Sequence, residues 1–237
     1  MAAFPLMLPG TSRPPKLVVF DLDHTLIACD ATILWTEFLY EKKIVTDPIW
    51  RQYDRDMVKS YAKGVLDIRD FCRKHAGAFR SIPEEKLHAL AQEFAKKKIA
   101  PLIFPDGKKW VKNALQANIP ACVLSASAAF IVKPIAKLFG LTDAMGIELA
   151  FKDGFCTGEI VGIPTFQEGK VERLSQRLAE AGIGFEDVLF FTDSRNDLPL
   201  AERAGYTVCV NPDAVLESSA RKNGWKVAEW KLSLRTQ

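Results

Sequence analysis

The sequence predicts an α/β fold: a doubly wound parallel sheet with a helical cap inserted after the first strand and a small β-hairpin insertion. The first observation is a set of continuous apolar runs at residues 16–23, 120–127, 187–194 and 206–212. Strands that are covered on both faces have such runs in place of alternation. The second observation is a set of helical patterns between the later strands, at 132–139, 169–181 and 197–204. Strand–helix alternation of this kind favours the doubly wound architecture.

A long segment without a strand pattern follows the first strand. Residues 32–102 are rich in helix formers and carry periodic apolar residues such as Trp35, Phe38 and Leu87. The segment is too long for an ordinary crossover connection. We therefore expect a helical cap domain at 32–102, packed over the carboxyl ends of the strands, and an α/β core at 14–31 and 103–237.

The second strand lies in an uncharged stretch, residues 113–132, that is long enough to span a bilayer. Its central Pro120 and its polar residues are unusual in a membrane helix, so we expect a helix end, a turn, a buried strand and a loop. Alternating residues at 148–162 flank the dipeptide Asp153-Gly154, which favours a β-hairpin. Residues 224–230 are expected to add an edge strand.

The composition is that of an ordinary globular chain. Of 237 residues, 48% are hydrophobic and 26% charged, and the net charge is +3. Nucleic acid is not indicated as a partner, because no clustered basic footprint is present. The five cysteines are scattered without a C-x-x-C pair, which favours reduced thiols and a cytoplasmic location. Residues 1–16 lack the basic region of a signal peptide, so we expect a loose lead-in.

Polar residues follow three of the predicted strands. In a doubly wound sheet these strand ends form one crevice, where ligands bind. The residues concerned are Asp21 and Asp23 after the first strand, Ser125 after the second, and Asp193 with Asp197 after the third. Gathered carboxylates repel one another unless a cation lies between them. Few protein ligands, with water and a phosphate oxygen, are typical of Mg²⁺, so we expect a magnesium and phosphate site.

Four motifs in order, "DLDHT", "LSAS", "GKVERL" and "TDSRND", resemble those of the haloacid dehalogenase-like phosphatase superfamily. The helical insertion, the hairpin and "GEIVGIPTFQEGKVERL" most resemble its phosphoserine-phosphatase-like branch, and the likeness covers about residues 16–213. The resemblance implies a Mg²⁺-dependent phosphomonoesterase that acts on a small phosphorylated metabolite through an aspartyl-phosphate.

The resemblance also implies a role for each motif residue. Asp21 would be the nucleophile. Asp23 would protonate the leaving oxygen and then activate water, while its backbone carbonyl binds the metal. Lys170 would balance charge beside Asp21. Asp193 would bind Mg²⁺ directly and Asp197 would hold metal-bound waters. The phosphate contacts would come from Ser125, the adjoining backbone at Ala126, Asn196 and the supporting residue Thr25.

Several assignments have structural alternatives. Ser127 competes with Ser125 for the phosphate, because "SAS" offers two hydroxyls. Lys133 and Lys152 are rivals of Lys170. Asn196 competes as a helix N-cap. Of the histidines, His24 is expected to have a structural or supporting role, and His75 and His88 are expected to be solvated.

Substrate choice is expected to come from the cap. In the phosphoserine-specific relatives an acidic residue shortly after the first motif holds the substrate ammonium, and Asp30 falls at about that position. Asp30 could equally be the N-cap of a helix that begins near Ala31. No single arginine identifies itself as a clamp for a substrate carboxylate; the candidates by position are Arg51, Arg55, Arg69 and Arg73. An amine-bearing phosphomonoester, such as phosphoserine or histidinol phosphate, is compatible with this pattern.

Three alternative functions are compatible with the same core residues: phosphotransfer to an acceptor other than water, binding of a phospho-ligand without turnover, and hydrolysis of a lipid phosphate. The intact set of motif residues disfavours a binding role, and no amphipathic basic helix or membrane span indicates a lipid substrate. Dehalogenation is disfavoured, because displacing halide needs no acid at Asp23. The sequence carries no signal of oligomeric state.

Overall fold

The computed structural model describes residues 13–232, and its centre is a six-stranded sheet. The strand order is β3-β2-β1-β6-β7-β8, and every neighbouring pair is parallel. The strands are β1 (Leu17–Phe20), β2 (Ala121–Ala128), β3 (Ala144–Ile147), β6 (Val188–Thr192), β7 (Tyr206–Val210) and β8 (Lys226–Ala228). The chain runs from β1 to β2 and β3 on one side and then returns to β6 on the other side of β1, so the strand order reverses at β1. The predicted doubly wound parallel sheet is confirmed.

Helices cover both faces of this sheet. On one face, α5 (Pro105–Gln116) and α6 (Ala129–Lys137) pack against Val18 and Phe20. On the other, α7 (Glu168–Ala181) and the short α8 (Leu198–Ala201) pack against Leu17 and Val19. Helix α9 (Ala214–Asn223) packs beside β7, and the 3₁₀ turns η4 (Phe185–Asp187) and η5 (Arg195–Asp197) flank β6. Successive residues of β1 thus enter two different cores, which explains its unbroken apolar run.

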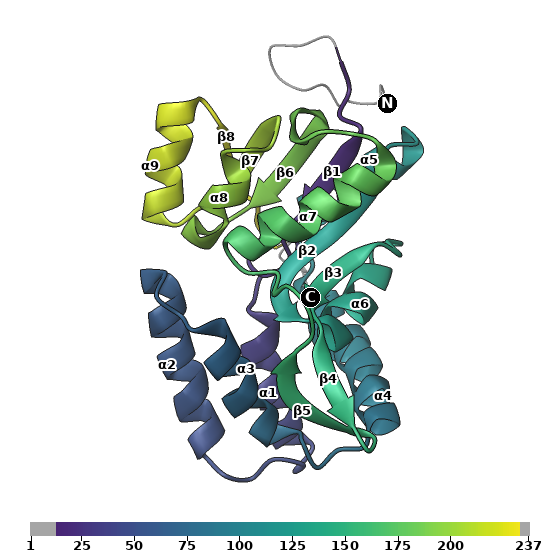
Figure 1. Ribbon diagram of the computed structural model, residues 1–237, viewed down its shortest axis with the longest axis vertical. Coiled ribbons are helices and arrows are strands. Elements are labelled where there is room, and N and C mark those ends of the chain that lie inside the picture. The colour runs from purple at the N-terminus through teal and green to yellow at the C-terminus, as the bar shows by residue number, and fades with distance from the viewer. Residues whose placement is uncertain (1–12, 233–237) are drawn as a thin grey trace, which may run out of the picture.

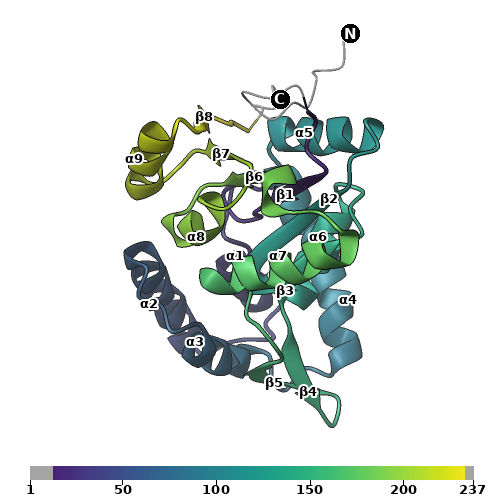
Figure 2. The ribbon, with the colours of Figure 1, turned by 45° about the horizontal axis from the view of Figure 1, so that its top comes forward.

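The segment between β1 and α5 is helical, as expected. It contains α1 (Ala31–Glu41), α2 (Ile49–Lys63), α3 (Ile68–His75) and α4 (Glu84–Phe94), here called the cap helices. Short turns join or extend them: η1 (Ala76–Ala78), the π-helical η2 (Ala95–Ile99) and η3 (Ala100–Leu102). Figures 1 and 2 show α2 and α3 side by side beyond the carboxyl ends of β1 and β2, so this part of the chain faces the predicted crevice.

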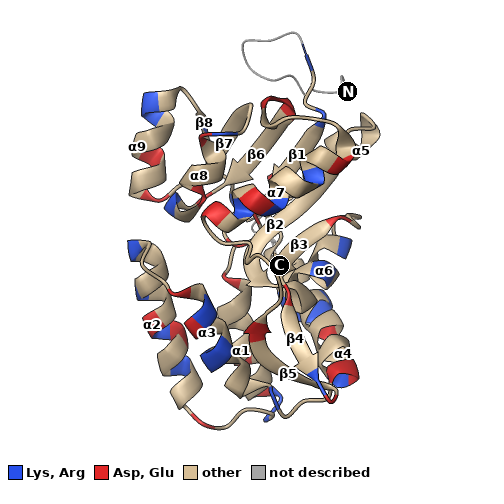
Figure 3. Ribbon diagram, in the orientation of Figure 1, with Lys and Arg blue, Asp and Glu red and all other residues tan. Residues whose placement is uncertain are grey.

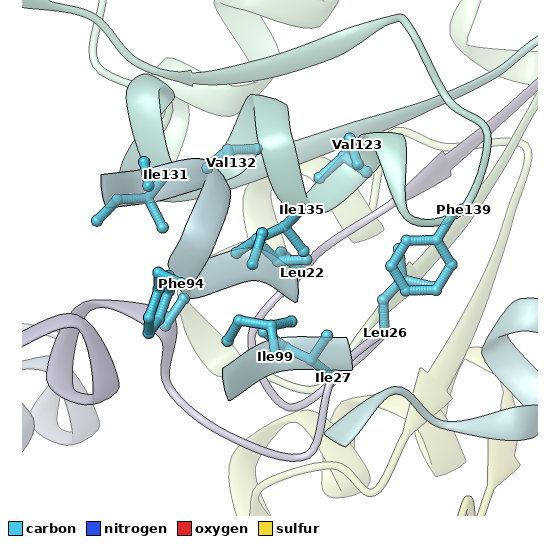
Figure 4. Close-up of a cluster of buried hydrophobic side chains, with 14 of the residues drawn as sticks. Leu22, Leu26, Ile27, Phe94, Ile99, Val123, Ile131, Val132, Ile135 and Phe139 are labelled. Carbon is cyan, nitrogen blue, oxygen red and sulfur yellow. The ribbon is translucent and has the colours of Figure 1, made fainter. Parts of the chain in front are cut away.

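A continuous apolar core joins the cap helices to the sheet. Figure 4 shows Phe94 and Ile99 of the insertion close to Leu22 and Ile27, which follow β1, and to Ile135 of α6. All five side chains are almost fully buried. Trp35 of α1 extends this core through ring contacts with Phe38, Phe94 and Phe130. Burying an aromatic side chain stabilises by about 2–3 kcal/mol, so the insertion is anchored firmly to the core.

The predicted hairpin is present as β4 (Leu149–Lys152) and β5 (Phe155–Ile160), which pair antiparallel. Its turn residues Asp153 and Gly154 both have positive φ, at 52° and 80°. Two consecutive residues of this kind form the tight turn that Asp-Gly favours. The hairpin packs against α3 of the cap helices.

No helix within residues 13–232 is long and apolar enough to cross a bilayer. The uncharged stretch 113–132 folds as the end of α5, a turn and the buried strand β2, as predicted, but its last residues begin α6 and do not form the predicted loop. Acidic and basic residues intermix along α2, α4 and α7 in Figure 3. Of the lead-in predicted at 1–16, the first 12 residues lie outside the described part.

Candidate active site

The two aspartates of the first motif lie at the end of β1, on a tight turn. The backbone N–H of Asp21 donates to the Phe191 carbonyl of β6, which continues the sheet by one bond at 2.9 Å. Beyond it, the N–H groups of Thr25, Leu26 and Ile27 all donate to the Leu22 carbonyl. His24 is exposed, has a φ of 53° at this turn and lines the cavity described below. The turn directs Asp21 and Asp23 into one cavity.

Lys170 joins the first, third and fourth motifs. Its Nζ donates to Asp21 Oδ1 at 2.7 Å and to Asp197 Oδ2 at 2.8 Å, and its side chain is 1% exposed. Thr192 Oγ1 also donates to Asp197, at 2.7 Å. Of the rival lysines, Lys133 pairs with Glu148 at the surface and Lys152 is exposed. The geometry therefore places Lys170, and neither rival, beside Asp21.

Asp23 is held by donors from the second motif and the first cap helix. Its Oδ1 accepts from the Ala31 N–H at 2.7 Å, and its Oδ2 accepts from Ser127 Oγ at 2.8 Å and Ser125 Oγ at 3.4 Å. Ser125 is fully buried and also accepts from the Ser127 N–H, whereas Ser127 and Ala126 line the cavity. Both hydroxyls of the second motif thus face the same carboxyl group.

The fourth motif contributes Asp193 beside the first. Thr25, which is fully buried, donates from Oγ1 to Asp193 Oδ1 at 3.3 Å, so it fixes the turn against β6. Asn196, predicted to contact the phosphate, is buried and does not line the cavity: its Nδ2 donates to the Tyr61 carbonyl of α2 and to Ser194. Asn196 is not the N-cap either, because Ser194 caps η5.

The carboxyl groups of this site carry more negative charge than Lys170 balances. Burial raises the pKa of Asp21 to about 7, and the charges of Asp197 and Asp23 add to the rise while Lys170 opposes it. Burial and the charge of Asp30 raise the pKa of Asp23 to about 6. The pKa of Asp193 is raised well above its usual range by burial and by Asp21 and Asp197. Burial lowers the pKa of Lys170, but the charges of Asp197 and Asp21 together raise it by more. The pKa of Lys170 is therefore above its usual value, and the ammonium stays protonated.

This excess charge fits a hard divalent cation. Asp21, Asp23 and Asp193 line one cavity and offer only oxygen donors. Between residues 13 and 232, no three His, Cys, Asp or Glu side chains form a metal-binding cage. Mg²⁺ is ordinarily bound by one or two carboxylates with water and substrate phosphate rather than by such a cage. The donor set therefore fits Mg²⁺.

The cavity extends from these carboxylates to the cap helices and has a volume of about 190 Å³. Asp30 lies on its wall and is also the N-cap of α1, where it accepts from the Ile33 N–H at 3.0 Å. The N-cap interpretation of Asp30 is therefore confirmed, and its place on the cavity wall is compatible with the substrate-binding one. Burial raises the pKa of Asp30, although backbone N–H groups of α1 oppose the rise.

The wall that α2 and α3 contribute to the cavity is mainly apolar. The side chains that α2, α3 and the segment between them contribute are Met57, Val58, Tyr61, Ala62, Leu66, Ile68 and Phe71. Among the described residues that line the cavity there is no lysine or arginine. The four arginines considered as carboxylate clamps, Arg51, Arg55, Arg69 and Arg73, are all exposed and none lines the cavity. Arg51 instead pairs with Glu37.

Sequence reasoning missed several residues around the site. Tyr61 reaches the cavity from α2, and Gln167 donates to the Asn196 side chain at 3.1 Å. Thr165 donates to the Ser125 carbonyl and so fixes the second motif. The prediction that His75 is solvated is wrong: it is 5% exposed, because it packs between α1 and α2, 3.0 Å from Thr36 Oγ1 and 3.5 Å from Asp54. His88 is half exposed, as predicted.

Comparisons with known proteins show the family of this chain. The family profile described as haloacid dehalogenase-like hydrolase matches residues 18–202. A histidinol-phosphatase of Neisseria meningitidis is 36% identical over 91% of this chain and 99% of its own length. Phosphoserine phosphatase SerB1 of Mycobacterium tuberculosis is 27% identical over 97% of this chain and 77% of its own length. A crystal structure of a Bordetella pertussis protein of unknown function superposes with a TM-score of 0.81 at 32% identity, over 89% and 96% of the two chains.

Proposed function

The chain belongs to the haloacid dehalogenase-like hydrolase family and is a phosphomonoesterase, and we propose that it hydrolyses a small, amine-bearing phosphomonoester through a phosphorylated Asp21. The contact that carries this proposal is the buried one between Lys170 and Asp21 at the end of β1. A carboxylate held against an ammonium, with a cavity on its open side, is placed to attack phosphorus while the nearby positive charge stabilises the transferring group.

Asp23 is the proposed general acid and base. It lies two residues after Asp21, lines the same cavity and is oriented by Ser127 and the Ala31 N–H. From there it would donate a proton to the leaving oxygen and later take one from the attacking water. The phosphate would be bound by Ser125 Oγ and the Ala126 N–H, with Thr25 fixing the turn.

Mg²⁺ is the proposed cofactor, with Asp21, the Asp23 carbonyl and Asp193 as its protein ligands and Asp197 nearby. When bound, the ion supplies positive charge that offsets the incoming phosphate and the crowded carboxylates. Asp197 would also hold Lys170 in place, because Lys170 Nζ donates to both Asp197 and Asp21.

The substrate proposed is a phosphorylated amino alcohol of the histidinol-phosphate type. Asp30 is the acidic group that could accept the ammonium, while the apolar wall of α2 and α3 would pack against the rest of the molecule. Phosphoserine is disfavoured, because its carboxylate would enter a wall without a lysine or arginine and lose its hydration unpaired. A relative that is 36% identical is a histidinol-phosphatase, which supports this choice.

The two predicted domains are proposed to have different roles. Residues 32–102 would form the cap domain that selects the substrate, and residues 14–31 with 103–237 the core that handles phosphate. The five cysteines are all free thiols, which supports work in the reducing cytoplasm.

A panel of phosphomonoesters tests the function. It contains histidinol phosphate, phosphoserine, phosphoethanolamine, a sugar phosphate, a nucleotide, a lysophosphatidate and an aryl phosphate, each assayed with Mg²⁺ and with EDTA. We expect Mg²⁺-dependent phosphate release that is fastest for histidinol phosphate and lost in Asp21→Asn. Preference for phosphoserine would refute the substrate assignment, and equal turnover in the variant would refute the nucleophile.

A further inference from the structure

The end of α2 meets the core through a small set of polar contacts. Gln167 Nε2 donates to the Gly64 carbonyl at 3.2 Å and to Asn196 Oδ1 at 3.1 Å. Asn196 Nδ2 in turn donates to the Tyr61 carbonyl at 3.0 Å. Gly64 is the C-cap of α2, with a φ of 72°. These core amides therefore satisfy carbonyls at the negative end of a cap helix.

Gln167 has an unusual backbone for this task. It lies at the N-cap position of α7 with φ 48° and ψ −124°, and its side chain makes no bond to its own helix. A residue other than glycine in this region is strained, and the strain persists only where the surroundings impose it. The loop before it is tightly wound, because a Cβ on Gly169 would lie 1.9 Å from the Pro164 carbonyl oxygen.

The same loop leads directly to Lys170. The Lys170 N–H donates to the Gln167 carbonyl at 3.0 Å, so the two residues belong to one turn. On the cap side, Tyr61 packs its ring 5.8 Å from Phe166 and lines the cavity beside Asp21. A contact at Gln167 thus connects the wall of the cavity to the residue that balances the charge of Asp21.

We propose that Gln167 is a positioning residue whose side-chain amide clasps α2 onto the core and so holds the cavity closed over the substrate. Release of this clasp would let the end of α2 leave the core, and only the clasped form would bind substrate with full affinity. The apparent affinity then falls in proportion to the clasped fraction. The kinetic part of this inference rests on the proposed function, whereas the clasp itself can be measured without turnover.

Three variants separate the amide from the backbone. Gln167→Ala removes the amide and keeps the strain, and Gln167→Gly removes both. Gln52→Ala is the matched control, because Gln52 is a glutamine of the same helix α2 whose amide bonds only the neighbouring Asp56 and Arg55. Amide hydrogen exchange is measured on peptides covering residues 58–66, with peptides of β1 and β6 as the reference for global stability.

We expect exchange at 58–66 to rise at least about fivefold in both Gln167 variants and to stay unchanged in Gln52→Ala and in the reference peptides. With histidinol phosphate, KM is expected to rise at least about fivefold while kcat changes less than about threefold. Gln167→Gly should melt higher than Gln167→Ala. Unchanged exchange at 58–66 in Gln167→Ala would overturn the clasp even if the enzyme is inactive on every substrate tested. Faster exchange with an unchanged KM in an active enzyme would overturn its role in binding.

Discussion

Lys170 Nζ lies 2.7 Å from Asp21 Oδ1, although the two residues are 149 positions apart in the sequence. The contact joins the end of β1 to the first turn of α7 and is sealed from solvent. A buried ammonium between two carboxylates is held by electrostatics that any uncharged replacement removes. The predicted chemistry of the site depends on this pair.

Replacing the lysine should therefore abolish most of the activity. In Lys170→Met we expect kcat to fall at least about 100-fold, because the positive charge that stabilises the transferring phosphoryl group is lost. Steady-state assays of Mg²⁺-dependent phosphate release measure this, and Lys133→Met, at the surface ion pair with Glu148, is the control. A Lys170→Met enzyme that keeps half of the wild-type kcat would contradict the assignment.

Asp23→Asn should slow turnover about 100- to 10,000-fold, since the variant can neither protonate the leaving oxygen nor activate water. An aryl phosphate, whose leaving group needs little protonation, should lose less in the first step than an alkyl phosphate does. Rapid-quench measurements of the two half-reactions distinguish these losses. Equal losses on both substrates would argue against proton donation by Asp23.

The two serines of the second motif should separate kinetically. Ser125→Ala is expected to weaken inhibition by inorganic phosphate about tenfold, because one direct bond to phosphate is lost. Ser127→Ala should leave that inhibition within about twofold but lower kcat, since Ser127 Oγ orients Asp23 at 2.8 Å. Product-inhibition constants and kcat values for both variants test this pairing. The reverse pattern would make Ser127 the phosphate ligand.

Asp30 offers a clean test of ammonium recognition, because asparagine caps a helix as well as aspartate does. In Asp30→Asn we expect KM for histidinol phosphate to rise at least about tenfold, through loss of a charge-assisted bond. Turnover of an aryl phosphate without an amine should change less than about twofold. An equal effect on the two substrates would mean that Asp30 acts only on the fold.

The buried pair His75–Asp54 predicts an unusual pH dependence of stability. Burial lowers the pKa of His75 to about 4, so its contribution to stability is lost as pH falls from about 6.5 toward 4. Burial raises the pKa of Asp54 to about 7, so its contribution grows as pH falls from about 7 toward 3.8. Between pH 4.5 and 6, roughly, the folded and unfolded pair bind the same number of protons, and the two effects cancel.

Single variants should separate the pH-dependent contributions of His75 and Asp54 to stability. Relative to the wild type, Asp54→Asn should lose about 1 kcal/mol of unfolding free energy per pH unit as pH falls from roughly 6 to 5. His75→Gln should gain stability over the same range. Urea unfolding at several pH values measures both slopes, and parallel slopes in all three proteins would contradict the pKa shifts.

Much of the fold could be predicted because local signals and the tertiary structure agree. The unbroken apolar runs of β1, β2, β6 and β7 and the Asp153-Gly154 turn each have a direct physical cause in the chain. Strand β3 was missed, because its four residues Ala144–Ile147 include a glycine and show no periodicity. They form a strand because they pair with β2. Helix α6 begins three residues before the predicted position, at Ala129.

In the site, too, residues with a local sequence signal could be predicted and residues that depend on tertiary contacts could not. Residues that carry the chemistry lie in motifs, so Asp21, Asp23, Lys170 and Asp193 could be predicted to meet. The contacts of Tyr61 and Gln167 could not, because they arise only when α2 docks on the core. The burial of His75 has no local signal either: its neighbours Arg73 and Lys74 are exposed, and only packing against α1 and α2 removes it from water.

The phosphorylated enzyme itself tests the central claim most directly. Wild-type protein is mixed with radiolabelled substrate and Mg²⁺, quenched in acid within milliseconds, digested with pepsin in acid and mapped by mass spectrometry. We predict a label that is stable in acid and labile in alkali on Asp21, in the peptides that contain this residue, and absent from Asp21→Asn. Rapid turnover without any labelled peptide, or a label on another residue, would contradict a mechanism through Asp21.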